Sequence, residues 1–184
     1  LIPLTKKYPF VEWGILFSGS RQGTQRYPSE EWLGNLSAYA HGGGLSLCAH
    51  LCGKWVRELV LEGRGSWWQK YDSFSKLCKR VQLNFHGQYH KAGLGFIGEL
   101  RKVRGQDFIF QHDGVNDGLI STFTNNATIR AFPLFDRSGG AGIVPKEWPK
   151  PIWTYQGYAG GIGPANIVDE IHRRQIVNEQ NISH

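Results

Sequence analysis

The feature that most constrains the fold of this chain is a regular alternation of short apolar segments with helical ones. Helical connections predict right-handed β-α-β units and a parallel sheet, because a hairpin cannot join parallel neighbours. The sequence therefore predicts the α/β class. The expected strands, which combine β-branched or aromatic residues with strand-like length, are residues 11–18, 45–52, 81–86, 107–112, 129–136 and 153–159. The expected helices, most of which lie between these strands, are residues 29–39, 54–61, 73–80, 96–103, 117–125 and 164–174.

Two features favour a closed barrel over an open, doubly wound sheet. No G-x-G-x-x-G motif follows the first expected strand, which disfavours a dinucleotide-binding fold. Several strands also end in polar residues, and a barrel gathers such ends into one mouth; these residues are Ser18, His86, His112 and Asp136. We predict a parallel (β/α)8 barrel of the TIM type, forming one domain over residues 1–184. Because the chain lacks Met and starts inside a segment that looks structured, we expect the barrel to be incomplete at one or both ends.

The net charge of +6 and the isoelectric point of about 9.3 raise the hypothesis of a nucleic-acid partner. The basic residues are dispersed, however, and pairs such as Lys79-Arg80 and Arg173-Arg174 lie near expected helix ends, where cations offset the helix dipole. Solvated helix faces explain this distribution first and an anionic small ligand second. An RNA- or DNA-associated protein is the third alternative, which the dispersed charge disfavours.

Cysteine content and hydropathy bear on the compartment and on metal binding. Cys48, Cys52 and Cys78 cannot all pair internally, so we expect a reducing, cytoplasmic environment. No apolar run reaches the roughly 20 residues that span a bilayer, and no membrane association is expected. Cys48 and Cys52 flank His50 on one expected strand, but positions four apart on a strand are separated by roughly 13 Å, too far to share a zinc ion. We expect no metal and no cofactor, and we expect both thiols to pack in the core.

Adjacent tryptophans leave two interpretations open. Trp67 and Trp68, with Tyr71 and Phe74 nearby, could form an exposed aromatic patch for a partner, such as the second subunit of a homodimer. Burial of the same residues against the barrel is the alternative.

Four stretches of the chain, taken in order, resemble phosphoribosylanthranilate isomerases. Residues 14–29 resemble that family's second strand and the loop after it, and residues 81–87 resemble its fourth strand. Residues 134–142 resemble the sixth strand, and residues 159–167, which begin Ala-Gly-Gly-Ile-Gly-Pro, are similar to the seventh. The resemblance implies a (β/α) barrel that binds a phosphorylated ribose derivative and isomerises it by an Amadori-type rearrangement.

The principal candidate site is a glycine loop formed by Gly160, Gly161 and Gly163, between the last expected strand and the last expected helix. Free backbone N–H groups and the positive end of a helix can surround a phosphate, and glycine permits the close approach. An ordinary strand-to-helix turn also favours glycine, so the residues alone leave both interpretations open. The family resemblance favours phosphate binding.

Asp136 closes an otherwise apolar strand, so its carboxylate is expected at the barrel mouth rather than in the core. The resemblance implies that Asp136 is the general acid that protonates the ribose ring oxygen. An aspartate that caps a turn or a helix is the alternative. Gly139 and Gly140 follow in the same matched stretch and are candidate substrate-binding residues. The family's general base lies on its first strand, outside the four matched stretches, so no residue is assigned that role.

The other candidate ligand-binding residues are Arg21 and Arg26, in the loop after the first expected strand, and His86. A guanidinium can hold a carboxylate or phosphate with two hydrogen bonds, although exposed arginines also favour solubility. Gln82, Asn84 and His86 alternate with apolar residues and form a polar face that would point into a barrel. The expected partner is a small phosphorylated ligand. The alternative to an isomerase is an inactive barrel that binds or sequesters a phosphorylated metabolite or nucleotide.

Overall fold

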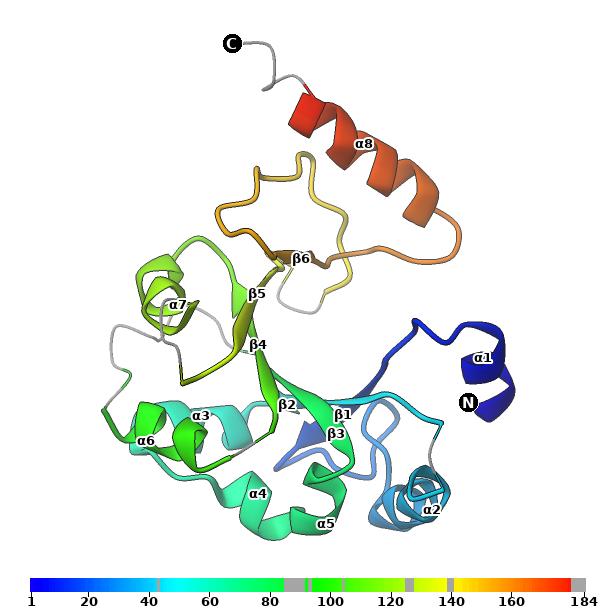
Figure 1. Cartoon of the computed structure of the whole chain (residues 1–184), viewed down its shortest axis with the longest axis vertical. Coiled ribbons are helices and arrows are strands. Elements are labelled where there is room, and N and C mark those ends of the chain that lie inside the picture. The colour runs from blue at the N-terminus through cyan, green and yellow to red at the C-terminus, as the bar shows by residue number, and fades with distance from the viewer. Residues whose placement is uncertain are drawn as a thin grey trace.

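The computed structural model describes residues 1–42, 44–84, 92, 94–103, 105–124, 128–138 and 141–179. Its centre is a six-stranded sheet in which every neighbouring pair is parallel and the strand order follows the sequence (Figure 1). The strands are β1 (Trp13–Ser18), β2 (Leu47–Cys52), β3 (Cys78–Leu83), β4 (Asp107–His112), β5 (Ala131–Phe135) and β6 (Gly157–Tyr158). The α/β class and the parallel sheet are confirmed, and all six expected strands are present.

The helices alternate with the strands as expected, with differences at the ends. They are α1 (Ile2–Lys7), α2 (Glu30–Ala40), α3 (Lys54–Glu62), α4 (Ser66–Lys70), α5 (Asp72–Ser75), α6 (Leu94–Lys102), α7 (Asp117–Thr124) and α8 (Ile167–Glu179). Ser29 caps α2 as the sequence predicts, because its side chain accepts a hydrogen bond from the N–H of Trp32 at 3.1 Å. The sequence did not predict α1 and α4.

The expected helix over residues 73–80 is wrong in its second half, because β3 already begins at Cys78. Cys78 is buried in the core, whereas Arg80 donates to Glu12 at 2.8 Å on the opposite side of the sheet. Val81 then returns to the core. The spacing of three between Cys78 and Val81 reflects a bulge, because Leu47 pairs with Cys78 whereas the next residue, Cys48, already pairs with Arg80. This irregular start interrupts the period of two by which a strand is found in sequence.

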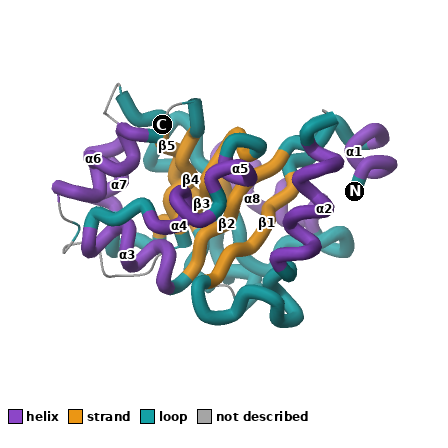
Figure 2. The backbone as a smooth tube through the Cα atoms, turned by 90° about the horizontal axis from the view of Figure 1, so that it is seen from below, coloured by secondary structure: helices purple, strands orange, loops and turns teal. Residues whose placement is uncertain are grey.

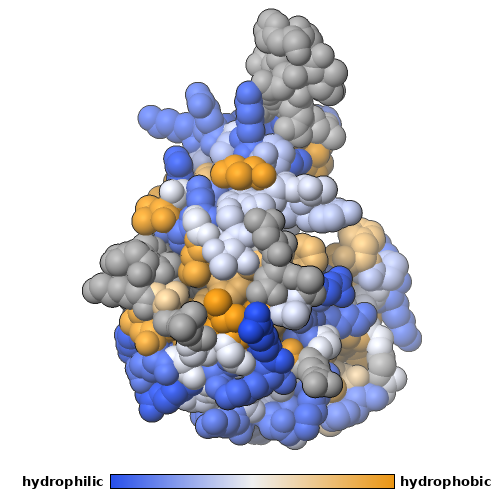
Figure 3. All heavy atoms as spheres, turned by 60° about the vertical axis from the view of Figure 1, so that its left-hand side comes forward, coloured by the Kyte–Doolittle hydropathy of each residue, from blue (hydrophilic) through white to orange (hydrophobic). Residues whose placement is uncertain are grey.

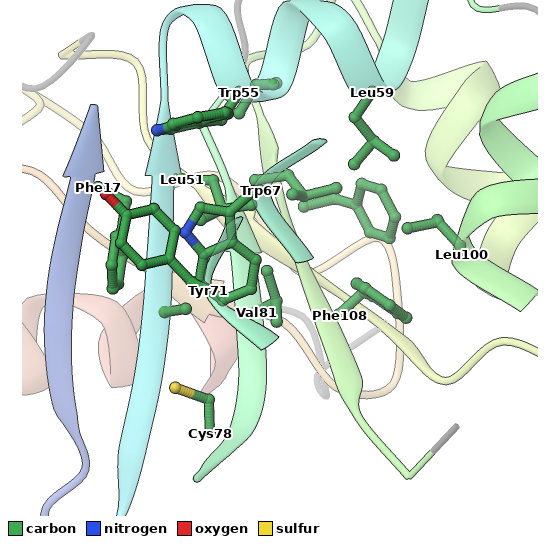
Figure 4. Close-up of a cluster of buried hydrophobic side chains, with 14 of the residues drawn as sticks. Phe17, Leu51, Trp55, Leu59, Trp67, Tyr71, Cys78, Val81, Leu100 and Phe108 are labelled. Atoms are coloured by element: carbon green, nitrogen blue, oxygen red, sulfur yellow. The ribbon is translucent and has the colours of Figure 1, made fainter. Parts of the chain in front are cut away.

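One face of the sheet carries the hydrophobic core. The strand residues on that face are almost fully buried, and they are Ile15, Phe17, Leu47, Ala49, Leu51, Val81, Leu83, Phe108 and Phe110. Side chains from α2 to α7 cover them, among them Leu33, Leu59, Trp67, Phe74, Leu100 and Phe123. In Figure 4, the rings of Trp67 and Tyr71 lie against Phe17, with centroid distances of 5.1 and 4.9 Å. Helices α2 to α7 therefore pack on the same side of the sheet.

The aromatic segment that could have formed a surface patch is part of this core. Trp67 is 1% exposed, Tyr71 7% and Phe74 4%, and Trp68 is half-buried, with its indole N–H donating to Gln106 at 3.0 Å. The interpretation of this segment as an exposed partner surface is wrong, and burial against the sheet is confirmed.

Strand order and helix placement together distinguish this sheet from a doubly wound one. In a doubly wound sheet the strand order reverses and helices cover both faces. Here the order follows the sequence without reversal, and Figure 2 shows α3, α4 and α5 together on the near side of the strands. The arrangement is compatible with part of a TIM-type barrel wall.

Candidate functional site

The face of the sheet opposite the core carries a cluster of polar side chains on its middle strands. His50 on β2 and Gln82 on β3 are register partners, and their Nε2 atoms lie 2.7 Å apart. Gln82 Nε2 also donates to Asn84 Oδ1 at 2.9 Å, and Asn84 Nδ2 donates to Cys52 Sγ at 3.3 Å. We call these four residues the polar cluster. All four are half-buried, so they are partly accessible, and the expected polar face of β3 is confirmed at Gln82 and Asn84.

Burial and hydrogen bonding together set the environment of His50. Its Nε2 is within hydrogen-bond distance of the Gln82 side-chain amide, and the roles of donor and acceptor in this contact depend on the ring tautomer. Burial lowers the pKa of His50 below its ordinary value, and the positive charge of Arg26 acts in the same direction. A hydrogen bond with Asn84 and the negative charge of Asp136 oppose this shift. His50 is therefore a neutral imidazole at neutral pH.

The thiols on this face are not poised as nucleophiles. Burial raises the pKa of Cys48 to about 12. Burial also raises the pKa of Cys52, although hydrogen bonds from Asn84 and Tyr27 and the charge of Arg26 oppose it. Cys48 is buried, as expected of a packed thiol, whereas Cys52 is half-buried and bonded to Asn84, so the expected core position is wrong for Cys52 alone. A thiol with a raised pKa stays protonated, and the thiolate is the reactive form.

Asp136 directly follows β5 at its carboxyl end. Its Oδ1 accepts hydrogen bonds from the backbone N–H of Ser138 at 2.9 Å and from the Ser138 hydroxyl at 2.7 Å. The turn interpretation of Asp136 is thus confirmed for this oxygen. Oδ2 accepts no hydrogen bond from a described residue, and the negative charge acts on His50. Oδ1 therefore fixes the side chain, while Oδ2 is not bonded within the described part of the chain.

The glycine loop begins where β6 ends, and its backbone requires glycine at two positions. Gly160 has φ +122° and Gly161 has φ +62°, both in the region that side chains disfavour. A Cβ on Gly161 would lie 2.5 Å from the backbone nitrogen of Val144 and 2.7 Å from the carbonyl oxygen of Gly142. Packing of the segment 142–144 therefore requires these glycines whether or not a ligand binds.

Asp136 and the glycine loop are adjacent. A Cβ built on Gly160 would lie 3.8 Å from Asp136 Oδ1, and the N–H of Ala159 donates to the carbonyl of Phe135 at 2.8 Å. The N–H groups of Gly160, Gly161 and Ile162 find no acceptor among the described residues. Gly163 differs, because its N–H donates to Asn166 Oδ1 at 2.7 Å. The loop thus offers free donors next to a carboxylate, and Gly163 serves the turn into α8.

A cavity of about 500 Å³ lies beside the loop, between β6 and α8. Its wall includes Gly160, Gly161, Tyr158 and Arg174. The Arg174 guanidinium stacks on the Tyr158 ring at 4.2 Å, and its Nε is buried with no hydrogen-bond partner among the described residues. A buried guanidinium donor without an acceptor is a natural partner for an anion.

Helix α8 is held against the loop by a second arginine. The indole N–H of Trp148 donates to Glu170 at 2.7 Å, and Arg173 donates to both carboxylate oxygens of Glu170 at 2.8 Å. The hydrogen bond from Trp148 and the pairing with Arg173 lower the pKa of Glu170, while desolvation opposes them. Glu170 therefore pairs with Trp148 and Arg173, and among the described residues Arg174 Nε is left without a hydrogen-bond partner.

The remaining predicted site residues fall into three groups. Arg26 is exposed, and its positive charge acts on His50 and Cys52. Arg21 is also exposed, and its backbone carbonyl closes a turn by accepting from Thr24 at 3.0 Å. The positions that lie outside the described residues are His86, Gly139 and Gly140.

His112 does not join this site. It is 2% exposed on the side of the sheet that carries the core, and its Nδ1 lies 2.7 Å from Asp117 Oδ1. Its ring also packs edge-on against Trp153 at 5.1 Å. His112 is a packed structural histidine.

Sequence reasoning missed two residues that the structure brings to the site, His50 and Arg174. His50 was considered only as a zinc ligand, although the alternation Cys-Ala-His-Leu-Cys already placed it on one face with Cys52. Arg174 gave no signal beyond a basic helix end. Among the described residues, no group of three or more His, Cys, Asp or Glu side chains could hold a metal ion.

Several basic side chains form ion pairs at separate places on the surface. These pairs include Lys54 with Glu58, Lys70 with Glu30, Lys76 with Asp72, Lys102 with Glu99 and Arg130 with Asp107. Figure 3 shows the hydrophilic surface interrupted by small, separate apolar spots. Within the described part of the chain, no helix is both long and apolar enough to cross a membrane.

No protein-family model, no curated protein and no solved structure matches this chain.

Proposed function

We propose that the chain is a (β/α)-barrel protein that binds a phosphorylated ribose derivative and isomerises it by an Amadori-type rearrangement, as its resemblance to phosphoribosylanthranilate isomerases implies. The observation that carries the proposal is the adjacency of Asp136 and the glycine loop. A Cβ on Gly160 would stand 3.8 Å from Asp136 Oδ1, so a ligand on the loop N–H groups would meet the carboxylate. The carboxyl ends of neighbouring parallel strands are where barrel enzymes hold substrates.

The phosphate is assigned to the N–H groups of Gly160 and Gly161, with Arg174 as the cation of the adjoining cavity. Free N–H groups before a helix favour anions, and a guanidinium adds charge-assisted hydrogen bonds. The cavity of about 500 Å³ lies within the usual range for small-molecule sites.

Asp136 is assigned the general acid. Protonation of the ribose ring oxygen lets the nitrogen on C1 expel it, which opens the ring and gives an iminium ion. Loss of the C2 proton then gives an enaminol, which becomes the ketone as C1 gains a proton and the C2 hydroxyl loses one. The net change is an isomerisation and needs no redox partner.

Closure of the wall into a barrel of eight units is part of the same proposal. Parallel sheets are normally covered on both faces, whereas α2 to α7 cover only one face here. Closure would cover the other face with the sheet itself and would place the polar cluster, Asp136 and the glycine loop around one mouth.

Asp136→Asn tests the catalytic part of the proposal. Asparagine keeps an oxygen that can accept from Ser138, so the variant should melt like the wild type. It cannot donate the acid's proton, so turnover of phosphoribosylanthranilate, followed by loss of its fluorescence, should fall by about 100-fold or more. Ser138→Ala is the matched control, because it removes the hydroxyl that donates to Asp136 Oδ1 but leaves the Asp136 carboxyl in place. Full turnover by Asp136→Asn would refute the role of Asp136.

A catalytically inactive binder is the second candidate. It is favoured by the raised pKa values of Cys48 and Cys52, because a protonated thiol cannot act as the general base. In that case the wild type would bind ribose 5-phosphate without converting phosphoribosylanthranilate. Equilibrium binding and turnover measured on the same preparation separate the two candidates.

A further inference from the structure

We infer that the cavity between β6 and α8 binds a small aliphatic monocarboxylate, whose carboxylate pairs with Arg174 and whose hydrocarbon chain lies on the isoleucines of α8 and the loop before it. In the proposed function Arg174 is the cation beside the phosphate. This inference goes beyond that function, because it gives the cavity a ligand of its own, and it holds for an isomerase and for a binder alike.

The cavity is distinct from the space next to Asp136. Its wall is formed by Trp148, by residues 158–162 and by one side of α8, and Asp136 does not line it. A Cβ on Gly160 would instead lie 3.0 Å from the carbonyl oxygen of Ile143 and 3.8 Å from Asp136 Oδ1. A ligand can therefore occupy the cavity without touching the carboxylate that is assigned to catalysis.

One stripe of α8 supplies both an apolar surface and a cation. Ile167, Ile171 and Arg174 are spaced by four and three residues, so they follow one face of the helix, and all three line the cavity. Ile162, before the helix, extends the apolar part. The three isoleucines are between 36% and 50% exposed, and Figure 1 shows α8 apart from the helices that cover the sheet. Apolar surface left in water favours a ligand that covers it with hydrocarbon.

The charge in the cavity wall is unbalanced at Arg174. Its guanidinium lies over the Tyr158 ring at 4.2 Å, and its Nε is buried without a hydrogen-bond partner among the described residues. Glu170, the acidic residue of the wall, is already bonded to Arg173 and Trp148. A guanidinium with free donors can hold both oxygens of a carboxylate with parallel N–H groups.

A single negative charge fits this cavity better than the double charge of a phosphate. One carboxylate neutralises Arg174, whereas a phosphate dianion would leave one charge uncompensated beside Glu170 and among apolar side chains, where an unpaired charge is costly. The available apolar surface is aliphatic, because Trp148 is only 4% exposed. Ile167 and Arg174 are seven positions apart, which is about 10 Å along a helix, and an extended octanoate has a similar length.

The test titrates octanoate, butanoate and inorganic phosphate calorimetrically into the full chain. Each CH₂ group that leaves water should tighten binding by about two- to fourfold, so the wild type should bind octanoate at least about tenfold more tightly than butanoate. Arg174→Gln should weaken octanoate binding by about tenfold or more, because it removes the charge that pairs with the carboxylate. Arg57→Gln, at an exposed arginine of α3, removes the same charge elsewhere and should bind octanoate like the wild type.

A matched pair of variants on α8 tests the hydrocarbon part of the site. Ile171→Ser and Val168→Ser each remove an exposed apolar side chain from this helix, but only Ile171 lines the cavity. Ile171→Ser should weaken octanoate binding by about fivefold, and Val168→Ser should leave it within about twofold. Both variants change exposed positions and should melt within about 1–2 °C of the wild type, so the pair tests the inference even if Arg174→Gln does not fold.

The outcomes separate this inference from the proposed function. Equal affinity for octanoate and butanoate, or equal octanoate affinity of Ile171→Ser and Val168→Ser, would overturn the inference. A dimer in sedimentation velocity that Ile171→Ser converts to a monomer would also overturn it, because a second copy of the chain would then cover the stripe. A wild type that binds octanoate but not inorganic phosphate would overturn the phosphate site alone. The reverse result would overturn this inference and leave the phosphate site standing.

Discussion

Gly161→Ala tests the packing of the glycine loop most directly. Gly161 has φ +62°, a conformation that costs a residue with a side chain about 1–2 kcal/mol. The new Cβ would also lie 2.5 Å from the nitrogen of Val144 and 2.7 Å from the oxygen of Gly142. Both are backbone atoms, so no side-chain rotation relieves the overlap, and overpacking of this kind costs about 1–3 kcal/mol more. The sum is about 2–5 kcal/mol.

Thermal unfolding followed by circular dichroism measures this cost. For a chain of this size, about 1 kcal/mol shifts Tm by roughly 2–4 °C, so Gly161→Ala should lower Tm by at least about 4 °C. Gly163→Ala is the matched control in the same loop, because a Cβ there meets no atom within 4 Å and φ is not in the left-handed region. Its Tm should stay within about 1–2 °C of the wild type.

Binding adds a second measurement to the same pair of variants. Displacement of the segment 142–144 moves the N–H groups of Gly160 and Gly161, so Gly161→Ala should also weaken inorganic phosphate binding by about tenfold or more. Equal melting of Gly161→Ala and Gly163→Ala would refute the packing argument. A lowered Tm with unchanged phosphate affinity would refute the phosphate assignment alone.

Two further predictions concern titration. Because burial raises the pKa of Cys48 and Cys78 to about 12, both thiols should react with a disulfide reagent at pH 8 far more slowly in the folded chain than in guanidinium chloride; equal rates would contradict their burial. In the folded chain the pKa of His50 is lowered from its ordinary value of 6.5. As the pH falls below 6.5, the unfolded chain therefore takes up a proton on this histidine before the folded chain does, and the folded state loses stability relative to the unfolded state. Urea unfolding measured from pH 7.5 to 5 should show this loss of stability, and the His50→Gln variant should not show it. The charged or titratable groups that act on or lie next to His50 are Arg26, Asp136 and Cys52. Its register partners on the neighbouring strands, Leu16 and Gln82, do not titrate.

The strands were predictable because burial on the core face imposes a strong pattern. Phe17, Leu51, Val81 and Phe110 each sit at alternate positions of an apolar run, and each is fully buried. The start of β3 was not predictable, because Arg80 is satisfied by Glu12, far away in sequence. A residue whose partner is distant in sequence carries no local signal of its structure.

The candidate site was predictable in its backbone and less so in its side chains. Gly160 and Gly161 stand out in sequence because positive φ and close approach both exclude a Cβ. His50 and Arg174 did not stand out, because their roles depend on contacts made after folding. Gln82 contacts His50 from the next strand, and the Tyr158 ring of β6 packs against the Arg174 guanidinium.

The face of the sheet that α2 to α7 leave uncovered is polar in its middle. A dry barrel interior is filled by branched apolar side chains, which need no partners. Here the middle of that face carries His50, Gln82 and Asn84, and each buried polar group left unpaired would cost about 1–3 kcal/mol. The polar cluster satisfies these groups mutually, through hydrogen bonds that join neighbouring strands. A face built only for packing would gain stability if all three were replaced with apolar residues, because apolar side chains need no such partners.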